Sequence, residues 1–390
     1  MSQRSRLGDA LAGILDRAHR LHPEDLPSLV EDAVGIIGGR ETEIYLVDLA
    51  QDVLLRFSGA GEAELDIDAT IAGRAFRSTS PVTIESEGEL RAWVPILDGA
   101  ERLGVIGAVV DDDEQIESLG RIATLVAEII VARANYGDAL TMGRRRQPLS
   151  LPSELRWAML PPLTFATERV TIAAFVAPPY EIAGDTFDYS VTGPTAHFAV
   201  FDAMGHGLEA SQMANLAVGA YRHARRSGID LVDTHHHIDA AIAEEFGSSK
   251  FVTAAFAQLD LDRGGLRVLL AGHPRPLLVR DGNLVGDLDV RPTLPLGLGL
   301  GDERPSVGEF QLEPADFLLL YSDGVVEGRD EHGEPFGVDR LADFLIRAQA
   351  NDEPAAETMR RLGRAILAHQ GTELEDDATL LSVQWRRSSI

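Results

Sequence analysis

The sequence predicts an α+β protein of two domains. Its 390 residues are more than one hydrophobic core usually organises. Apolar runs of strand length recur along the chain, and in the second half the longer helical patterns come in pairs and not one after each strand. That order is typical of layered sheets covered by helices, so we expect this class and not a parallel α/β sheet.

The bulk composition narrows the function classes. Hydrophobic residues make up 45% of the chain and charged residues 25%, as in soluble globular proteins. The formal net charge of −27 disfavours binding to nucleic acid, and the lack of cysteine excludes disulfides, thiolate metal sites and cysteine nucleophiles. No apolar stretch is long enough for a membrane span or a signal peptide, so we expect a cytoplasmic protein without membrane contact.

The first segment, residues 1–140, mixes helix and strand patterns. Apolar residues at helical spacing extend over residues 5–37, and a closing helix is predicted at residues 116–141. The wide apolar stripe of this closing helix either covers its own domain or forms the seam of a dimer. Between the two helical regions, a short helix is predicted at residues 69–76 and strands at residues 43–47, 53–57, 92–96 and 104–110.

Residues 141–162 are predicted to form a helical linker. The first part, GRRRQPLSLP, is charged and then contains proline, and the second part, SELRWAMLPP, starts a short helix that a proline pair stops. The second domain follows as residues 163–388. Its predicted strands are residues 169–177, 197–201, 251–257, 266–270, 276–279, 316–321 and 378–383, and its predicted helices are residues 208–226, 235–246, 338–349 and 353–369.

Four aspartates lie at the ends of strands in the second domain. Asp202 and Asp323 directly follow the runs HFAVF and FLLLYS, Asp377 directly precedes ATLLSV, and Asp185 follows Gly184 after a proline turn. Carboxylates brought from several strand ends to one point suit Mg²⁺ and Mn²⁺, and two such ions can make a shared water nucleophilic. An Asp-Gly pair after a strand is also a common turn, so each aspartate alone carries both interpretations.

Other polar residues are weaker candidates. His206 and His273 lie in glycine-containing turns. His206 either stabilises its turn or contacts a phosphate. His273 either fixes its turn or acts directly at the reaction centre. The histidines at 235–237 are consecutive near a helix start and do not share one helix face, so a metal site there is disfavoured. Lys250 and Arg275 are candidates for contact with a substrate phosphate, although the sequence gives no geometry for that contact.

The order of elements in residues 1–140 resembles a GAF domain. TIAGRAF is followed by SPVTI, by AWVPI, by ERLGVIGAVV and then by the closing helix. The resemblance implies a small antiparallel sheet with helices, which binds a small molecule or dimerises. We therefore expect a homodimer with a regulatory small-molecule ligand whose identity the residues do not specify.

Residues 156–385 resemble the SpoIIE/RsbU-type branch of the PP2C (PPM) serine/threonine phosphatases. The matching segments, in family order, are RWAMLPP, YEIAGDTFDYS, FAVFDAMGHGLEASQMA, KFVTAAFAQLD, LLAGHPRPLLV, LLLYSDGVVEGRDEHGEPFG and DDATLLSVQW. The resemblance implies an αββα sandwich. The chain departs from the family pattern at Ala183, where a glycine is usual, and at Ser322, where threonine is commoner.

The same resemblance implies roles for the site residues. Asp202 would bridge two ions, Mn²⁺ or Mg²⁺, and the backbone carbonyl of Ala203 would be a further ligand. Asp185 would bind one ion, directly or through water, and Asp323 and Asp377 would bind the other.

Other residues are expected to surround these ligands. Asp188 and Asp376 are expected as supporting groups behind them. No arginine closely precedes Asp185, the nearest upstream being Arg169, so the phosphate clamp is left mainly to the metals.

These resemblances imply a metal-dependent phosphoprotein phosphatase that hydrolyses phosphoserine or phosphothreonine. In this family the usual substrate is a phosphorylated STAS-domain anti-sigma-factor antagonist, whose dephosphorylation frees a sigma factor in a partner-switching pathway. Control by the GAF-like domain is expected. Two alternatives stay open: a signalling scaffold without turnover, and a small-molecule sensor in which the first domain has the main role.

Overall fold

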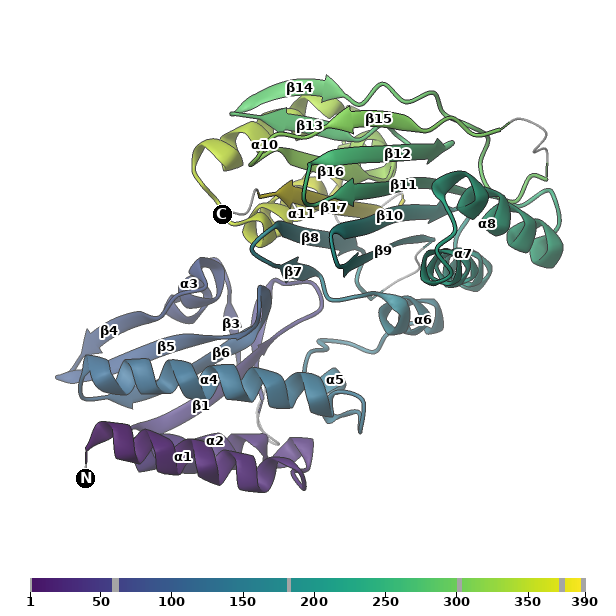
Figure 1. Ribbon diagram of the computed structural model, residues 1–390. Helices are drawn as coiled ribbons and strands as arrows, with labels where there is room; N and C mark the ends of the chain where they lie inside the picture. The colour runs from purple at the N-terminus through teal and green to yellow at the C-terminus, as the bar shows by residue number, and fades with distance from the viewer. Residues whose placement is uncertain (1, 58–62, 181–183, 300–303, 372–375, 387–390) are drawn as a thin grey trace. The chain divides into compact units, whose positions relative to one another are not determined.

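The chain forms two compact units, Met1–Pro148 and Leu149–Ile390. The structure, a computed structural model, describes residues 2–57, 63–180, 184–299, 304–371 and 376–386. Each unit is built from antiparallel sheets and helices (Figure 1). In the part of the chain that the structure describes, no helix is long and apolar enough to cross a membrane.

The first unit contains a single described sheet of six antiparallel strands in the order β3-β2-β1-β6-β5-β4. The strands are β1 (Arg40–Val47), β2 (Val53–Arg56), β3 (Glu64–Asp66), β4 (Val82–Ser86), β5 (Glu89–Asp98) and β6 (Glu101–Val110). The helices are α1 (Gln3–Ala18), α2 (Leu26–Ile37), α3 (Ile71–Ser78), α4 (Asp113–Arg133) and α5 (Ala139–Met142), with a 3-10 turn at Pro23–Asp25.

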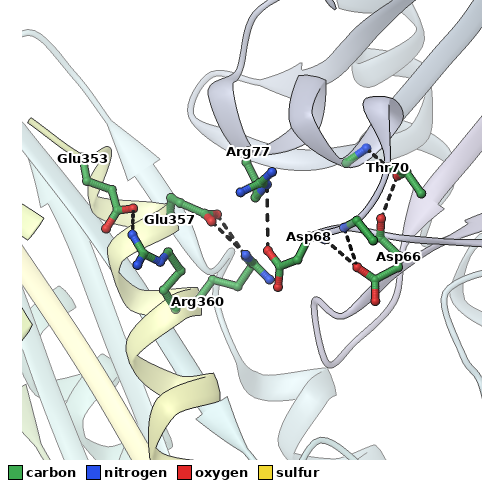
Figure 2. A network of polar contacts seen from close by, with 10 residues as sticks. Asp66, Asp68, Thr70, Arg77, Glu353, Glu357 and Arg360 are labelled. Carbon is green, nitrogen blue, oxygen red and sulfur yellow. Dashed lines mark hydrogen bonds and ion pairs between the residues drawn. The ribbon is translucent and has the colours of Figure 1, made fainter. Parts of the chain in front are cut away.

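Helices cover both faces of this sheet. Because successive side chains of a strand point to opposite faces, Ile44 and Leu46 of β1 pack with α1, α2 and α4. Tyr45 and Val47 pack on the other face with α3. The start of α3 is fixed locally, since the Thr70 hydroxyl accepts a hydrogen bond from the amide of Gly73 at 3.0 Å (Figure 2).

The helical pattern of residues 5–37 is confirmed, and the closing helix was predicted too long. Residues 5–37 are two helices, α1 and α2, separated by the 3-10 turn that begins at Pro23, because proline disrupts a helix interior. The closing helix α4 ends at Arg133, and the predicted end at residue 141 falls in the separate short helix α5. The intervening Gly137 has a low helix propensity, which favours a break there.

The second unit contains two antiparallel sheets, in the orders β15-β12-β11-β10-β9 and β14-β13-β16-β17-β8-β7. The first sheet consists of β9 (Asp185–Thr192), β10 (Thr195–Ala203), β11 (Val252–Asp260), β12 (Gly265–Ala271) and β15 (Gly308–Gln311). The second sheet consists of β7 (Thr164–Ala166), β8 (Val170–Ala177), β13 (Leu277–Arg280), β14 (Asn283–Asp287), β16 (Phe317–Tyr321) and β17 (Ala378–Trp385).

The two sheets enclose a shared apolar core and are covered by helices on their outer faces (Figure 1). Phe198 and Val200 of β10 meet Leu381 and Val383 of β17 in that core. The outer face of the first sheet is covered by α7 (Leu208–Arg226) and α8 (Leu231–Phe246). The outer face of the second is covered by α10 (Val338–Ala350) and α11 (Ala355–Gln370). Two short helices, α6 (Leu151–Met159) and α9 (Gly324–Glu327), lie nearer the strand ends that carry the aspartates.

Ion pairs support the first turns of α11. The buried Arg360 pairs with Glu357 at 2.8 Å on the same helix, and Arg361 pairs with Glu353 at 2.5 Å. Figure 2 shows both pairs beside the helix. Their glutamates, Glu353 and Glu357, lie near the helix start, where the helix dipole favours negative charge.

The strands and helices predicted for this unit are present, with ends that shift by a few residues. Four described strands, β7, β9, β14 and β15, were not predicted. All four are edge strands of the two sheets. An edge strand pairs on one side only and tolerates polar residues, so it need not contain the apolar run by which the other strands are predicted.

Asp188 of β9 lies on the outer face of the first sheet and contacts α7. Its carboxylate is 1% exposed and accepts hydrogen bonds from Arg222 at 2.7 Å and 2.9 Å and from Arg225 at 2.6 Å. Arg222 also donates to the carbonyl oxygen of Met159, at the end of α6, at 2.6 Å. The expectation that Asp188 supports the metal ligands is therefore wrong, because this residue joins β9 to α7 and α6.

Replacing Asp188 by asparagine should lower the free energy of unfolding by about 3 kcal/mol, because two largely buried guanidinium groups lose their counter-charge. The matched control is Asp262→Asn, which removes the exposed partner of Arg169 and should cost less than about 1 kcal/mol. Urea unfolding of the full chain measures both. Equal losses for the two variants would contradict the anchoring role of Asp188.

Candidate active site

The pleat of the strands directs the predicted aspartates into the gap between the two sheets. Asp185 of β9 and Asp202 of β10 are paired across the strands. Phe187 and Val200 lie two residues away on the same strands, and their side chains lie in the core between the sheets. Because side chains two residues apart share a face, Asp185 and Asp202 point toward the same space. Both carboxylates therefore lie at the same end of the sandwich.

Asp377 reaches this point from the second sheet. Its Oδ2 accepts a hydrogen bond from the amide of Gly184 at 2.5 Å, and the amide of Asp185 lies at 3.4 Å from the same oxygen. Ser322, which is fully buried at the end of β16, donates its hydroxyl proton to Oδ2 of Asp185. The hydroxyl of Ser322 in turn accepts from the amide of Thr379 at 2.9 Å. Polar contacts thus hold the two sheets together where the aspartates meet.

Two glycines permit this close approach. A Cβ on Gly324, next to Asp323, would lie 2.0 Å from the carbonyl oxygen of Asp377. A Cβ on Gly184 would lie 2.6 Å from the carbonyl oxygen of Ala203, the backbone group proposed as a ligand. Neither glycine is among the described residues with positive φ, so these positions need space and not a special turn conformation.

Burial and mutual repulsion disfavour ionisation of these carboxylates. Burial, followed by the charges of Asp323, Asp376 and Asp377, raises the pKa of Asp202 to about 7. Burial also raises the pKa of Asp377 to about 6. The pKa of Asp185 lies well above its ordinary value, chiefly through burial and then through the charges of Asp202 and Asp377. Positive charge placed among these carboxylates would favour their ionised forms.

A short polar chain supports Asp202 from β11. Thr253 is paired with Asp202, and its hydroxyl lies 3.5 Å from Oδ2 of that carboxylate. The same hydroxyl lies 2.8 Å from Nδ1 of His273. Burial lowers the pKa of His273 to about 3, so its imidazole is neutral near pH 7. This favours a role for His273 in orienting Thr253 over a role as a proton donor.

Arg156 is the residue that the sequence analysis missed. It lies on α6, is 2% exposed, and donates a hydrogen bond from Nη2 to the carbonyl oxygen of Pro178. Its positive charge lowers the pKa of Asp377, against the larger effect of burial. Arg169, which the sequence offered as the nearest upstream arginine, pairs instead with Asp262. The only sequence signal was an arginine within the apolar pattern of RWAMLPP.

The other candidates lie in different environments. Lys250 pairs with Glu209 at 2.6 Å, and Arg275 pairs with Asp289 at 3.0 Å. His206 is exposed in the loop after β10. Of the three consecutive histidines, which all lie on α8, the residue at 235 is buried, and burial lowers its pKa.

Ala183, the departure from the family pattern, lies outside the described residues.

The donor set fits Mg²⁺ or Mn²⁺ in its chemistry. Carboxylates and a backbone carbonyl are the oxygen ligands that these hard ions prefer, and a divalent cation would offset the burial and the repulsion that raise the pKa values. The side chains do not yet form a coordination shell: within the described residues, no group of three or more His, Asp or Glu is arranged to hold an ion.

Comparison with known sequences matches residues 192–386 to the family described as stage II sporulation protein E (SpoIIE). That range contains Asp202, Asp323 and Asp377 but not Asp185. Over 217 residues the chain is 24% identical to the phosphoserine phosphatase RsbU of Bacillus subtilis, which covers 55% of this chain and 63% of RsbU. It is 26% identical over 144 residues to protein IcfG of Synechocystis, covering 36% of this chain and 22% of IcfG. The chain therefore spans less than two thirds of either relative.

A solved structure shares the fold. The SiaA-PP2C domain of Pseudomonas aeruginosa is similar with a TM-score of 0.50 and 23% sequence identity. The similarity covers 65% of this chain and 98% of that domain. It supports a common arrangement of sheets and helices and says nothing of substrates.

Replacing Gly324 by alanine should lower the free energy of unfolding by about 3 kcal/mol, because the new Cβ collides with the backbone of Asp377 and overpacking is costly. The control is Gly219→Ala in α7, where a Cβ meets nothing within 4 Å and helix propensity should add about 0.5–1 kcal/mol. Urea unfolding measures both changes. A Gly324→Ala chain as stable as the original would contradict the close approach.

The stability of the metal-free chain should fall as pH rises from about 5 to about 8. Asp202 and Asp377 have folded-state pKa values of about 7 and about 6, and the unfolded value for aspartate is about 3.9. Within that interval the folded chain binds more protons than the unfolded chain, so raising the pH removes stability. Asp202→Asn should flatten this dependence. Urea unfolding in EDTA between these pH values tests it, and a wild-type stability that rises through the window would contradict it.

Proposed function

The chain belongs to the SpoIIE family of PPM-type protein serine/threonine phosphatases, and we propose that its second unit hydrolyses phosphoserine or phosphothreonine in a protein substrate. The observation that carries this proposal is the meeting of Asp185, Asp202 and Asp377 from both sheets at one end of the sandwich. Their raised pKa values mark a site that needs positive charge.

We assign the roles of the residues as follows. Asp202 would bridge two divalent ions, Mn²⁺ or Mg²⁺, and the carbonyl of Ala203 would add a backbone ligand. Asp185 would hold one ion, directly or through water, and Asp323 and Asp377 would hold the other. Ions bound there would supply a water of lowered pKa and positive charge for the phosphoryl oxygens.

The remaining contacts prepare these ligands. Ser322 holds Oδ2 of Asp185, and the amide of Gly184 holds Oδ2 of Asp377, so each carboxylate keeps its other oxygen for coordination. Thr253 of β11 orients Asp202, and the neutral His273, which follows β12, orients Thr253. Prior fixation of ligands reduces the entropy that is lost when the site forms.

For the substrate we propose a phosphorylated STAS-domain anti-sigma-factor antagonist in a partner-switching pathway. The similarity to RsbU supports this choice, although it extends over 63% of that protein. Phosphate release from a phosphorylated antagonist, measured beside an unrelated phosphoserine protein, tests it. Equal rates on both proteins would count against the assignment.

We further propose that residues 1–140 are a GAF-like sensory domain that regulates the phosphatase domain, residues 163–388, through the linker at residues 141–162, and that the chain is a homodimer. The six-stranded antiparallel sheet with helices on both faces supports the first assignment. A thermal-shift screen of the full chain against small molecules tests the regulation. A ligand that stabilises the chain and leaves its phosphatase rate unchanged would argue against it, and a monomeric mass in solution would exclude the homodimer.

The full chain should hydrolyse an aryl phosphate and a phosphoserine peptide only when Mn²⁺ or Mg²⁺ is present. Asp202→Ala and Asp323→Asn should each lower kcat/KM by at least about 100-fold, because each removes a proposed ligand. Asp262→Asn, which changes an exposed carboxylate elsewhere in the unit, should stay within about twofold.

The same assay separates the enzyme from the alternatives. A well-folded wild-type chain without metal-dependent turnover on either substrate would contradict the phosphatase proposal and favour a scaffold. Full activity in Asp202→Ala would show that the water is activated elsewhere.

A further inference from the structure

Helix α6 binds the backbone of the segment that leads toward Asp185. Three consecutive carbonyl oxygens accept hydrogen bonds from it: Pro178 from the Arg156 guanidinium, Pro179 from the Trp157 indole at 2.8 Å, and Tyr180 from the Ser150 amide at 3.3 Å. The helix is therefore attached to this segment by its N-cap residue and by two side chains of its last turns.

The guanidinium of Arg156 is buried and incompletely paired. Its residue is 2% exposed, and its Nε and Nη1 have no hydrogen-bond partner among the described residues. Because arginine keeps its charge in proteins, a buried guanidinium needs compensation by nearby negative charge. That charge comes from Asp377 and Asp185, the two carboxylates whose electrostatic effect favours the charged form of Arg156.

The burial of Arg156 also limits what it can contact. A side chain with 2% of its surface exposed does not present itself to a phosphoprotein, so its interactions are with the carboxylates and not with the substrate. The carbonyl of Pro178 holds Arg156 close to the cluster, because Pro178 follows Ala177 and Ala177 is paired with Ala378, the residue after Asp377.

We infer that Arg156 is a positioning residue whose guanidinium is the built-in counter-charge of Asp185 and Asp377, and that it thereby makes the metal affinity of the site depend on the docking of α6. The inference rests on the proposed metal-dependent function. It assigns to α6 an electrostatic role in addition to packing.

The sign of the effect follows from electrostatics. The guanidinium and a divalent cation are drawn to the same carboxylates and repel each other. Neutralising residue 156 therefore leaves the cluster more negative and tightens cation binding, even though it loosens α6. A purely structural role for Arg156 has the opposite consequence, since a loosened helix would weaken the site or leave it unchanged.

The test is the affinity of the full-length chain for Mn²⁺, measured by isothermal titration calorimetry. Arg156→Gln keeps a hydrogen-bond donor for Pro178 but removes the charge, and it should bind Mn²⁺ about tenfold more tightly than wild type. Arg156→Lys keeps the charge and should stay within about twofold of wild type. The control Arg222→Gln removes a different arginine tether of α6, the one that pairs with Asp188, and should leave the affinity unchanged.

The outcomes are distinguishable. If the wild-type chain binds no Mn²⁺, the proposed function fails. If it binds Mn²⁺ and Arg156→Gln binds it equally or more weakly, or if the lysine and glutamine variants behave alike, the counter-charge inference is wrong. Should Arg156→Gln lose its cooperative thermal transition, the Arg156→Lys arm decides, because a changed affinity with the charge retained would overturn the inference.

Discussion

The burial of Asp185, Asp202 and Asp377 beside one another is the constraint on which the rest of the second unit depends. Folding brings these carboxylates together because they stand at the ends of strands whose inner faces form one core. Their raised pKa values reflect the free-energy cost of ionising them there. The ionised form of these carboxylates is destabilised at this end of the fold, and such perturbed groups are typical of functional sites.

Several surrounding features follow from that constraint. The hydroxyl of Ser322 and the amide of Gly184 each bind one carboxylate oxygen, and the glycine at 324 leaves room for the backbone of Asp377. The two faces of β9 have different roles: Asp185 faces inward to the cluster, whereas Asp188 faces outward to two arginines of α7. Because β9 is anchored through Asp188 on its outer face, it can hold Asp185 on its inner face despite repulsion by the neighbouring carboxylates.

Much of this unit could be predicted from the sequence, because its central strands are continuous apolar runs and its helices have clear periodicity. The aspartates were found for the same reason, since each adjoins such a run or a glycine. The four edge strands could not be found this way, and β9 shows why: its sequence DTFDYSVT places polar side chains on both faces. Arg156 was missed because its importance comes from contacts with Pro178 and Asp377, which only the folded chain brings near it.

The proposed function requires that Asp202 binds two divalent ions. The most direct measurement is an anomalous difference map from crystals of the full chain grown with Mn²⁺. We expect two peaks that flank the carboxylate of Asp202, one toward Asp185 and the other toward Asp323 and Asp377. A chain that crystallises with saturating Mn²⁺ and shows no peak beside Asp202 would contradict it.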